Sequence, residues 1–351
     1  MSASLSKLLD SSNAEATLPS DCPPCKQFVF LNGAPVFVYS LSEFLRSPLI
    51  SEITIATKPE WNLKVLELVD ACTGALLQRE TPDPERSKCK TTALEVNIES
   101  AAQLRPPESQ DASLYRAAVH DALRAEYERH LTKFPYFFYD LVERRCVLGD
   151  AASWKDATKT AKGDSQQRYK MISLCTSGKS RASTVYNALL RKNALGVRLP
   201  GCCRAEYIAL VHDAVRPLLR CLDLGGLINA ARIFGAAVPA VSVADTIKVA
   251  TTDSGCTLVA NTPSRSTLFA VQTPQAFRSS LLKRAYASVM GEGDTEAPAH
   301  LTDDSSFVEQ LSNARVAMVP GHRMNVKLTT WEDIAICSRY LKEAYSPTAE
   351  S

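Results

Sequence analysis

Short apolar runs alternate with longer amphipathic segments over two parts of the chain. EITIATKP (52–59), MISLC (171–175) and YIALV (207–211) are rich in aliphatic and β-branched residues, a composition typical of buried strands. WNLKVLELVDACTGALL, which follows the first of these runs, has the three- and four-residue apolar spacing of a helix. Continuous apolar strands separated by helices predict an α/β protein with a Rossmann-like, mostly parallel sheet that carries helices on both faces.

The same pattern predicts the remaining elements. Apolar runs predict strands at 28–31, 236–249 and 314–321, and a shorter one at NVKL (325–328). Helical spacing predicts helices over the end of PVFVYSLSEFL and over RASTVYNALLRK, LLRCLDLGGLINAARIF and TTWEDIAICSRYLKEAY, with Thr330 and Asp333 resembling a capping box at the start of the last one.

Two segments precede or interrupt this order. Residues 77–168 contain proline-bearing loop-like stretches, a predicted amphipathic helix at 115–131 and a second apolar stretch, and we interpret them as an insertion packed on one edge of the sheet. Residues 1–21 show no periodicity and are predicted to be disordered. We therefore expect one domain, 22–346, interrupted by the insertion and followed by a frayed tail at 347–351.

Composition and charge narrow the class of protein. The hydrophobic fraction of 45% and the charged fraction of 22% are those of an ordinary globular protein. A net charge of +2 gives no basic field for nucleic acid, and no apolar run approaches the roughly 20 residues of a membrane-spanning helix. We expect neither kind of partner. Residues 1–21 contain acidic residues and no arginine, which fits a transit peptide badly, so the compartment, cytoplasm or plastid, stays open.

The eleven cysteines are scattered without regular spacing, and we expect no secretory signal before them. We interpret them as reduced, mostly buried thiols. Cys22 and Cys25 are separated by two residues, as in metal and redox motifs, but no second pair matches them. We interpret this pair as incidental, and the following residue, Lys26, as the one of chemical interest.

Polar residues follow the predicted strand YIALV. The sequence continues as His212-Asp213-Ala214-Val215-Arg216, at the carboxyl end of a strand, where ligands bind in open α/β sheets. A carboxylate at this point can coordinate a metal or accept sugar hydroxyls, and an arginine can bind a phosphate. An alternative interpretation is an Asp–Arg pair that only fixes the turn.

A second polar loop, TSGKSRAST, follows MISLC and precedes a helix. Gly178, Lys179 and Thr184 offer a glycine-containing turn, a cation and a hydroxyl at a helix start, which suits an anion or the sugar and base of a nucleotide. The alternative is a polar loop with an ordinary helix cap.

Single lysines also flank predicted strands. Lys26, Lys248 and Lys327 each have the position of a solvated residue that blocks edge pairing. Together with Lys179, and with Asp213 as an accompanying carboxylate, these lysines predict a site for highly anionic substrates.

An ordered set of segments carries a family resemblance: CKQFVFLNGAPVFVYSLSEFL, SGKSRASTVYNAL, LVHDAVRP, VPAVSVADTIK, FAVQTPQAF, LTDDSSFVE and NVKLTTWEDI. The set resembles the cytidylyltransferases that act on sugar-alcohol phosphates, and within them the 2-C-methyl-D-erythritol 4-phosphate cytidylyltransferases of the non-mevalonate isoprenoid pathway. The resemblance covers about 28–75 and 169–345. It implies the fold of the nucleotide-diphospho-sugar transferase type with a protruding β-arm for dimerisation.

The resemblance implies transfer of a cytidylyl group from CTP to the phosphate of a methylated tetritol, with Mg²⁺ as cofactor and pyrophosphate as the second product. Lys26 and Lys327 would flank the α-phosphate and stabilise the transition state. The residues expected to bind CTP are Gly178, Lys179, Thr184, Asp213 and Ala214, with Asp213 also the candidate metal ligand.

The acceptor polyol phosphate is expected to contact residues of both subunits of a homodimer. In the family an arm crosses the dimer interface, and in this chain the arm corresponds to about 246–266. The residues expected to bind the acceptor are Arg216, Thr273 and Thr302 from one subunit, and Thr246 and Arg265 from the arm of the other.

The N-terminal part departs from the family pattern. The family begins with an apolar strand and a glycine-rich loop that wraps the CTP phosphates, whereas this chain has no glycine before Gly33. The lysine of the family's proline–lysine pair is preceded in this chain by Cys25 rather than Pro24. We expect either an incomplete gene model or a version that binds CTP poorly. A ribitol 5-phosphate cytidylyltransferase, a non-catalytic relative and a generic sugar-nucleotide-binding domain are the alternatives.

Overall fold

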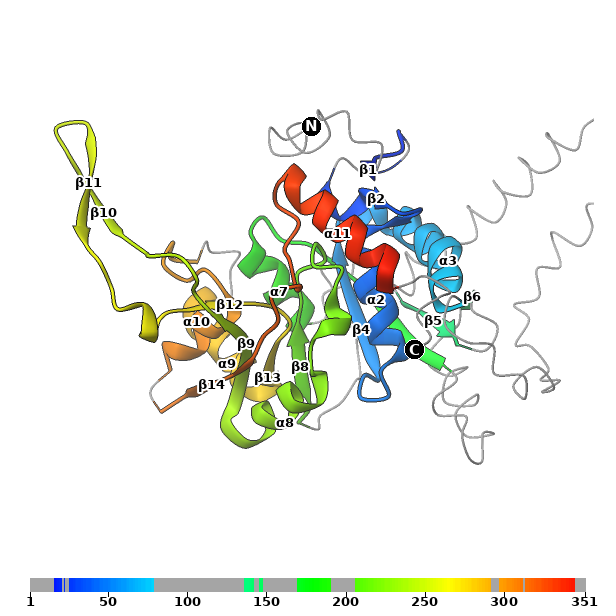
Figure 1. The fold of residues 1–351 in the computed structure, drawn as a ribbon. Coiled ribbons are helices and arrows are strands. Elements are labelled where there is room, and N and C mark those ends of the chain that lie inside the picture. The colour runs from blue at the N-terminus through cyan, green and yellow to red at the C-terminus, as the bar shows by residue number, and fades with distance from the viewer. Residues whose placement is uncertain are drawn as a thin grey trace, which may run out of the picture. The chain divides into compact units, whose positions relative to one another are not determined.

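The computed structural model divides the chain into two compact units. Unit 1 is formed by residues 1–200 with 330–351 and unit 2 by residues 201–329, and we describe each by itself (Figure 1). The predicted helix at 115–131 and the tail at 347–351 lie outside the described residues. The structure describes residues 16–20, 22, 25–78, 136–141, 145–147, 169–190, 206–291, 297–311 and 313–344.

Unit 1 contains a four-stranded sheet with the order β4-β7-β5-β6. β4 (Glu52–Thr57) and β7 (Tyr169–Thr176) pair in parallel. Ile172, Leu174 and Cys175 of β7 are at most 4% exposed, as expected for a strand covered on both faces. On the other side of β7, residues that the sequence assigns to the insertion extend the sheet as the antiparallel strands β5 (Tyr136–Asp140) and β6 (Arg145–Val147).

A small antiparallel sheet corrects two expectations about the N-terminal part of unit 1. Ala16–Thr17, predicted to be disordered, forms β1 on the edge of β2 (Phe30–Leu31). An available strand edge is a tertiary feature, which local periodicity does not reveal. The predicted strand at 28–31 is shortened because Lys26–Phe28 forms a 3₁₀ turn, η1, and β2 then pairs with β3 (Ala34–Pro35).

The helices of unit 1 bury the apolar residues that predict them. α2 (Val36–Arg46) is buried along most of its length, and α3 (Asn62–Gln78) buries leucines and valines at helical spacing. α11 (Trp331–Ala344) begins after Thr330, whose N–H donates to Oδ2 of Asp333 at 2.8 Å, one of the two contacts of the predicted capping box. The other described helical segments of unit 1 are η2 (Pro59–Trp61) and α7 (Arg181–Leu189).

β9 (Gly235–Ser242) is the central strand of unit 2 (Figure 1). β14 (Arg315–Pro320) pairs in parallel with one edge of β9, and β12 (Phe269–Val271) and β13 (Gln275–Arg278) pair antiparallel with its other edge. β8 (Ile208–Val211) pairs antiparallel with β13. The α/β fold is confirmed, and among the described residues its ladders are parallel at β4–β7 and β9–β14 and antiparallel at the other pairs.

Helices pack on this sheet through small and apolar side chains. Leu227 and Ala231 of α8 (Leu224–Phe234) form a buried cluster with Ala237 of β9 and Ala276 of β13. Tyr286 of α9 (Ser279–Met290) stacks on Phe307 of α10 (Asp304–Glu309), with ring centroids 4.2 Å apart. Unit 2 also contains the 3₁₀ turns η5 (Leu219–Cys221) and η6 (Arg265–Thr267).

Two strand predictions for unit 2 are corrected. Residues 236–249 do not form one strand, because β9 ends at Ser242 and the chain leaves the sheet before β10 (Val249–Asp253). Residues 325–328 form no strand, because the sheet edge ends with β14 at Pro320, and single hydrogen bonds to neighbouring loops replace a ladder.

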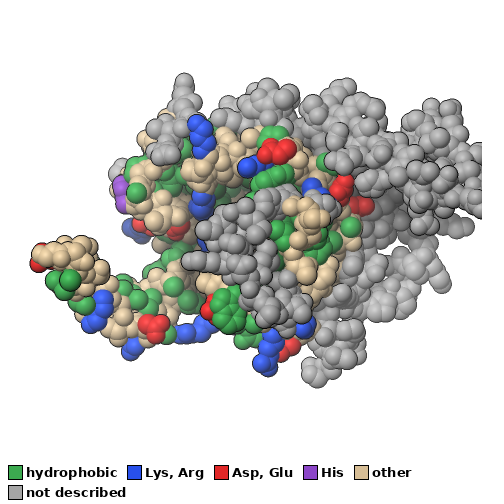
Figure 2. All heavy atoms as spheres, turned by 90° about the horizontal axis from the view of Figure 1, so that it is seen from above, with side chains coloured by type: hydrophobic (Ala, Val, Ile, Leu, Met, Phe, Trp, Pro, Cys, Tyr) green, Lys and Arg blue, Asp and Glu red, His purple; other side chains and the backbone are tan. Residues whose placement is uncertain are grey.

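β10 and β11 (Cys256–Asn261) form a two-stranded hairpin that projects from the sheet as an arm (Figure 1). The hairpin turns at Ser254 and Gly255, whose φ angles of +47° and +78° suit the twist of a tight β-hairpin. Every residue of both strands is exposed. Figure 2 shows hydrophobic side chains on the arm interleaved with basic and acidic ones.

Within the part of the chain that the structure describes, no helix has both the length and the apolar character to cross a membrane.

Three of the described cysteines, Cys22, Cys175 and Cys337, are buried. Burial raises the pKa of the Cys175 and Cys337 thiols to about 12, so both are unreactive. Cys22 is buried, and burial also raises the pKa of Cys25, which agrees with an incidental pair.

Candidate active site

The turn that follows β8 carries the first group of polar side chains. β8 ends at Val211, opposite Gln275 of β13, so His212 and Asp213 lie beside Thr273 in the break between β12 and β13. The N–H of Asp213 donates to Oγ1 of Thr273 at 3.0 Å, and the N–H of Arg216 donates to the carbonyl of Asp213 at 3.0 Å. The main chain of the turn is therefore fixed from both ends.

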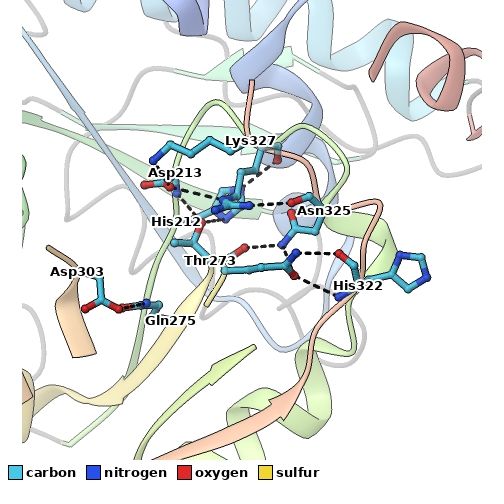
Figure 3. Close-up of polar contacts among 10 residues, drawn as sticks. His212, Asp213, Thr273, Gln275, Asp303, His322, Asn325 and Lys327 are labelled. Atoms are coloured by element: carbon cyan, nitrogen blue, oxygen red, sulfur yellow. Dashed lines mark hydrogen bonds and ion pairs between the residues drawn. The ribbon is translucent and has the colours of Figure 1, made fainter. Parts of the chain in front are cut away.

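The contacts of His212 determine its tautomer. Nε2 lies 3.2 Å from the carbonyl oxygen of Arg216, which only accepts, so Nε2 carries the proton. Nδ1 then accepts from the hydroxyl of Thr273 at 3.2 Å (Figure 3). Burial lowers the pKa of His212 to about 4, although the hydrogen bond to the Arg216 carbonyl and the Asp213 carboxylate act in the opposite direction. His212 is thus a neutral side chain that orients the turn.

Three charged groups meet at the carboxyl end of β8. Nζ of Lys327 lies 3.0 Å from Oδ2 of Asp213, and Nε of Arg216 lies 3.5 Å from the same oxygen. The side chain of Lys327 is 45% exposed, whereas those of Asp213 and Arg216 are 14% and 12% exposed. Burial lowers the pKa of Arg216, and the Asp213 carboxylate counteracts this. The ammonium is therefore the accessible member of the cluster.

The predicted residue Thr302 lies at a second loop of the same unit. Thr302 is exposed and precedes Asp303, the N-cap of α10. Oδ2 of Asp303 accepts from Nε2 of Gln275 at 2.7 Å, and the N–H of Ser305 donates to Oε1 of Gln275 at 3.1 Å. The start of α10 is thereby tied to β13, next to Thr273 in sequence.

Unit 1 brings together the residues of the TSGKSRAST loop. The N–H of Gly178 donates to Oγ1 of Thr184 at 2.9 Å, and that hydroxyl donates to the carbonyl of Ser180 at 2.8 Å. Ser180 and Ser183 form a capping box at the start of α7. A Cβ added at Gly178 would lie 2.1 Å from Oγ of Ser183, so only glycine fits. The ordinary helix cap considered from the sequence is present.

Two lysines of unit 1 were also predicted to bind the nucleotide. Lys179 is exposed in this loop at the carboxyl ends of β4 and β7, and Lys26 begins the η1 turn. The structure describes them in unit 1, whereas the Asp213 cluster belongs to unit 2.

The two residues of the arm that were predicted to bind the acceptor lie near its base, outside the strands β10 and β11. Thr246 and Arg265 are exposed, and the guanidinium of Arg265 donates to the carbonyl of Ala244 at 2.9 Å. Lys248 donates to Oγ1 of Thr262 at 2.8 Å. An open hollow of about 550 Å³ is lined by Ser242, Val243, Ala244, Ser264, Arg265 and Ser266.

Sequence reasoning missed two buried amides of the site, Gln272 and Asn325. Gln272 precedes Thr273, and Asn325 lies two residues before Lys327. Nδ2 of Asn325 donates to the carbonyl of Thr273 at 2.9 Å (Figure 3). The only sequence signal was proximity to residues already singled out.

Residues 144–343 match the model of a protein family described as 2-C-methyl-D-erythritol 4-phosphate cytidylyltransferase. A curated protein of that name from Geobacillus kaustophilus (strain HTA426) is 41% identical over 172 residues, which are 49% of this chain and 66% of the relative. Another, from Bacillus velezensis (strain DSM 23117 / BGSC 10A6 / LMG 26770 / FZB42), is 39% identical over 171 residues, 49% of this chain and 65% of the relative. The chain thus spans just under two thirds of their length.

A solved structure described as 4-diphosphocytidyl-2C-methyl-D-erythritol synthase is 22% identical, with a TM-score of 0.47, covering 90% of this chain and 94% of the solved one. The residues matched by the family model include Asp213, Arg216, Thr273 and Lys327, whereas Lys26 precedes them.

Proposed function

The chain belongs to the 2-C-methyl-D-erythritol 4-phosphate cytidylyltransferase family, and from this membership we propose that it transfers a cytidylyl group from CTP to 2-C-methyl-D-erythritol 4-phosphate. The products would be 4-diphosphocytidyl-2-C-methyl-D-erythritol, an isoprenoid precursor, and pyrophosphate. The observation that carries the proposal is the exposed ammonium of Lys327, held 3.0 Å from the Asp213 carboxylate beside Arg216. A cation fixed at the carboxyl end of a strand is suited to a phosphate.

The proposed chemistry is an in-line displacement. An oxygen of the acceptor phosphate forms a bond to the α-phosphorus of CTP, while the bond from that phosphorus to the pyrophosphate oxygen breaks. Negative charge increases on the α-phosphate and leaving-group oxygens, and a lysine ammonium stabilises it without transferring a proton. We assign this catalytic role to Lys327 and, from the family resemblance, to Lys26.

Two sets of residues are proposed to bind the nucleotide. For the base and ribose we propose Gly178, Lys179 and Thr184, supported by the compact loop that Gly178 and Thr184 form at the start of α7. For the phosphate end we propose Asp213 and Ala214. Ala214 is exposed in the turn after β8, which leaves room for a ligand next to its main chain.

The acceptor would be bound by Arg216, Thr273 and Thr302. Thr273 is 5% exposed and its hydroxyl already contacts His212 and Asp213, so its contribution to the acceptor would act largely through the position of Asp213. Thr246 and Arg265 of the arm would bind the acceptor phosphate of a second subunit, in a homodimer built through residues 246–266. Exposed apolar side chains on the arm support this assembly.

Magnesium is the cofactor that the reaction implies. Among the described residues no group of three His, Cys, Asp or Glu side chains is placed to hold a metal ion. Mg²⁺ is commonly bound by one or two carboxylates together with substrate phosphates, and Asp213 fits that donor set. Bound there with CTP, Mg²⁺ would neutralise charge on the phosphates.

The test is pyrophosphate release by the purified protein with CTP and Mg²⁺. The proposal predicts turnover with 2-C-methyl-D-erythritol 4-phosphate and little with ribitol 5-phosphate. Preference for ribitol 5-phosphate would reassign the substrate. A well-folded sample that turns over neither acceptor would favour a non-catalytic relative, and CTP titration calorimetry on the same sample would then show whether the nucleotide site is impaired.

A further inference from the structure

The segment that carries Lys327 is not held by a ladder. β14 ends at Pro320, and residues 321–329 form neither helix nor strand. Lys327 nevertheless lies beside Asp213, in the turn that follows β8. Its position therefore depends on individual hydrogen bonds between this segment and its neighbours.

Gln272 supplies two of these hydrogen bonds. Its side chain, 7% exposed, accepts from the N–H of His322 through Oε1 at 3.1 Å and donates from Nε2 to the carbonyl of the same residue at 2.9 Å (Figure 3). By pairing with both the N–H and the carbonyl of one residue, the side-chain amide takes the place of the two hydrogen bonds that a neighbouring strand would make. Gly321 leaves room for this contact, because a Cβ there would lie 2.8 Å from Oε1 of Gln272.

Asn325 joins the same segment to the two elements of the site. Its side chain, 1% exposed, donates to the carbonyl of Thr273 at 2.9 Å, and its main-chain carbonyl accepts from the guanidinium of Arg216 at 2.7 Å. Just beyond Lys327, the N–H of Leu328 donates to a carbonyl of the β8 turn at 2.9 Å. Lys327 is thus fixed on both sides.

We propose that Gln272 and Asn325 are positioning residues, which act on the reaction only through the place of the Lys327 ammonium. The inference rests on the proposed function, because the catalytic role of Lys327 is part of it. An uncharged amide both donates and accepts, which suits a buried contact with an N–H and a carbonyl. Because Lys327 would act on charge that develops in the transition state, loosening it should lower kcat and leave KM for CTP nearly unchanged.

The first test follows the segment directly. In Gln272→Met, which keeps the side-chain length and removes both polar atoms, hydrogen exchange of a peptide spanning 321–329 should become about tenfold faster. Gln275→Met is the matched control, because the Gln275 amide contacts Asp303 and Ser305 instead. It should speed exchange at 301–311 and leave 321–329 unchanged. Unchanged exchange at 321–329 in Gln272→Met, or equal acceleration in both variants, would overturn the inference.

The second test links the segment to turnover. Gln272→Met should lower kcat about tenfold or more while KM for CTP stays within about threefold. Faster exchange with wild-type kcat would contradict the positioning role. If the wild-type protein shows no turnover, the proposed function fails, while hydrogen exchange still decides whether Gln272 holds the segment. Should Gln272→Met not fold, Asn325→Asp, which keeps the shape but loses the donor to Thr273, is measured in the same two ways.

Discussion

The Nζ atom of Lys327 lies 3.0 Å from Oδ2 of Asp213, although the two residues follow different strands, β14 and β8. Arg216 contacts the same carboxylate oxygen at 3.5 Å. One carboxylate therefore faces two cations, and the cluster keeps a net positive charge. Such a cluster attracts phosphate groups while holding the lysine in one place.

Replacing this lysine should impair turnover without unfolding the protein. We expect Lys327→Met to lower kcat by about 10²–10³, the usual effect of removing one group that stabilises transition-state charge. The melting temperature should change little, because the side chain is 45% exposed. Lys342→Met, in the last turn of α11, is the control and should keep wild-type turnover. Wild-type kcat in Lys327→Met would refute the assigned role.

The hydroxyl of Thr273 should matter for stability. It accepts from the N–H of Asp213 and donates to His212, so Thr273→Val leaves both partners unsatisfied in a buried place. We expect a loss of about 1–3 kcal/mol in the free energy of unfolding, measured by urea denaturation. Thr273→Ser keeps the hydroxyl and should lose less. A loss in Thr273→Val no larger than that in Thr273→Ser would show that the hydroxyl is not the main stabilising group of this side chain.

His212 should make stability depend on pH in a defined window. Burial lowers its pKa from 6.5 to about 4, so between these values the unfolded chain binds a proton that the folded one does not. Stability therefore falls as the pH is lowered through this window and is fully present above it. Between about pH 7.5 and pH 5, the wild type should lose about 2 kcal/mol more than His212→Gln, which does not titrate. If urea denaturation gives the same loss in the free energy of unfolding between the two pH values for both proteins, this prediction is wrong.

The charged members of the site could be predicted because their positions follow a rule about sheets. Asp213 and Arg216 come directly after an apolar run, and the carboxyl ends of strands are where ligand-binding loops meet. The position of Lys327 at a predicted strand singles it out and the resemblance supplies its role, although the structure has no strand at residues 325–328. Val326 and Leu328 alternate with polar residues, as in a half-buried strand, but the described edge strand β14 ends at Pro320.

The uncharged residues of the candidate site could not be predicted from the sequence. Gln272 and Asn325 contact main-chain groups of residues far away in sequence, and such contacts leave no periodicity. For the same reason the engagement of Thr273 with His212 was not foreseen: a buried threonine and an exposed one look alike in a sequence. β1 is a similar case, since two residues pair with an edge that only tertiary structure creates.

The loop at Gly178 should tolerate no side chain. A Cβ at this position would lie 2.1 Å from Oγ and 2.7 Å from the main-chain carbon of Ser183, so the backbone itself must move in Gly178→Ala. Ser180→Ala, which only removes the cap of α7, should cost about 1 kcal/mol and serves for comparison. We expect a larger stability loss in Gly178→Ala, with weaker CTP binding by calorimetry. A loss no greater than that of Ser180→Ala would contradict the steric argument.

The arm should determine the oligomeric state. Val249, Leu258 and Val259 are 43%, 49% and 61% exposed on the two strands of the hairpin. Exposing apolar side chains to water is unfavourable, and association with a second copy would bury them. We expect a dimer in light scattering coupled to size exclusion, and a monomer for Leu258→Lys combined with Val259→Lys.

The matched control for the arm places the same two charges at polar positions. Thr252→Lys combined with Thr257→Lys changes two residues that pair with each other, next to the last pair before the turn, and removes no apolar side chain. If added charge alone disrupts the dimer, both double variants should be monomeric. If apolar contacts hold the dimer together, only the Leu258/Val259 variant should be monomeric. Because Thr246 and Arg265 lie near the base of the same arm, a monomeric variant should also show a raised KM for the acceptor with little change in KM for CTP. A monomeric wild type with full turnover would remove the arm from the active site.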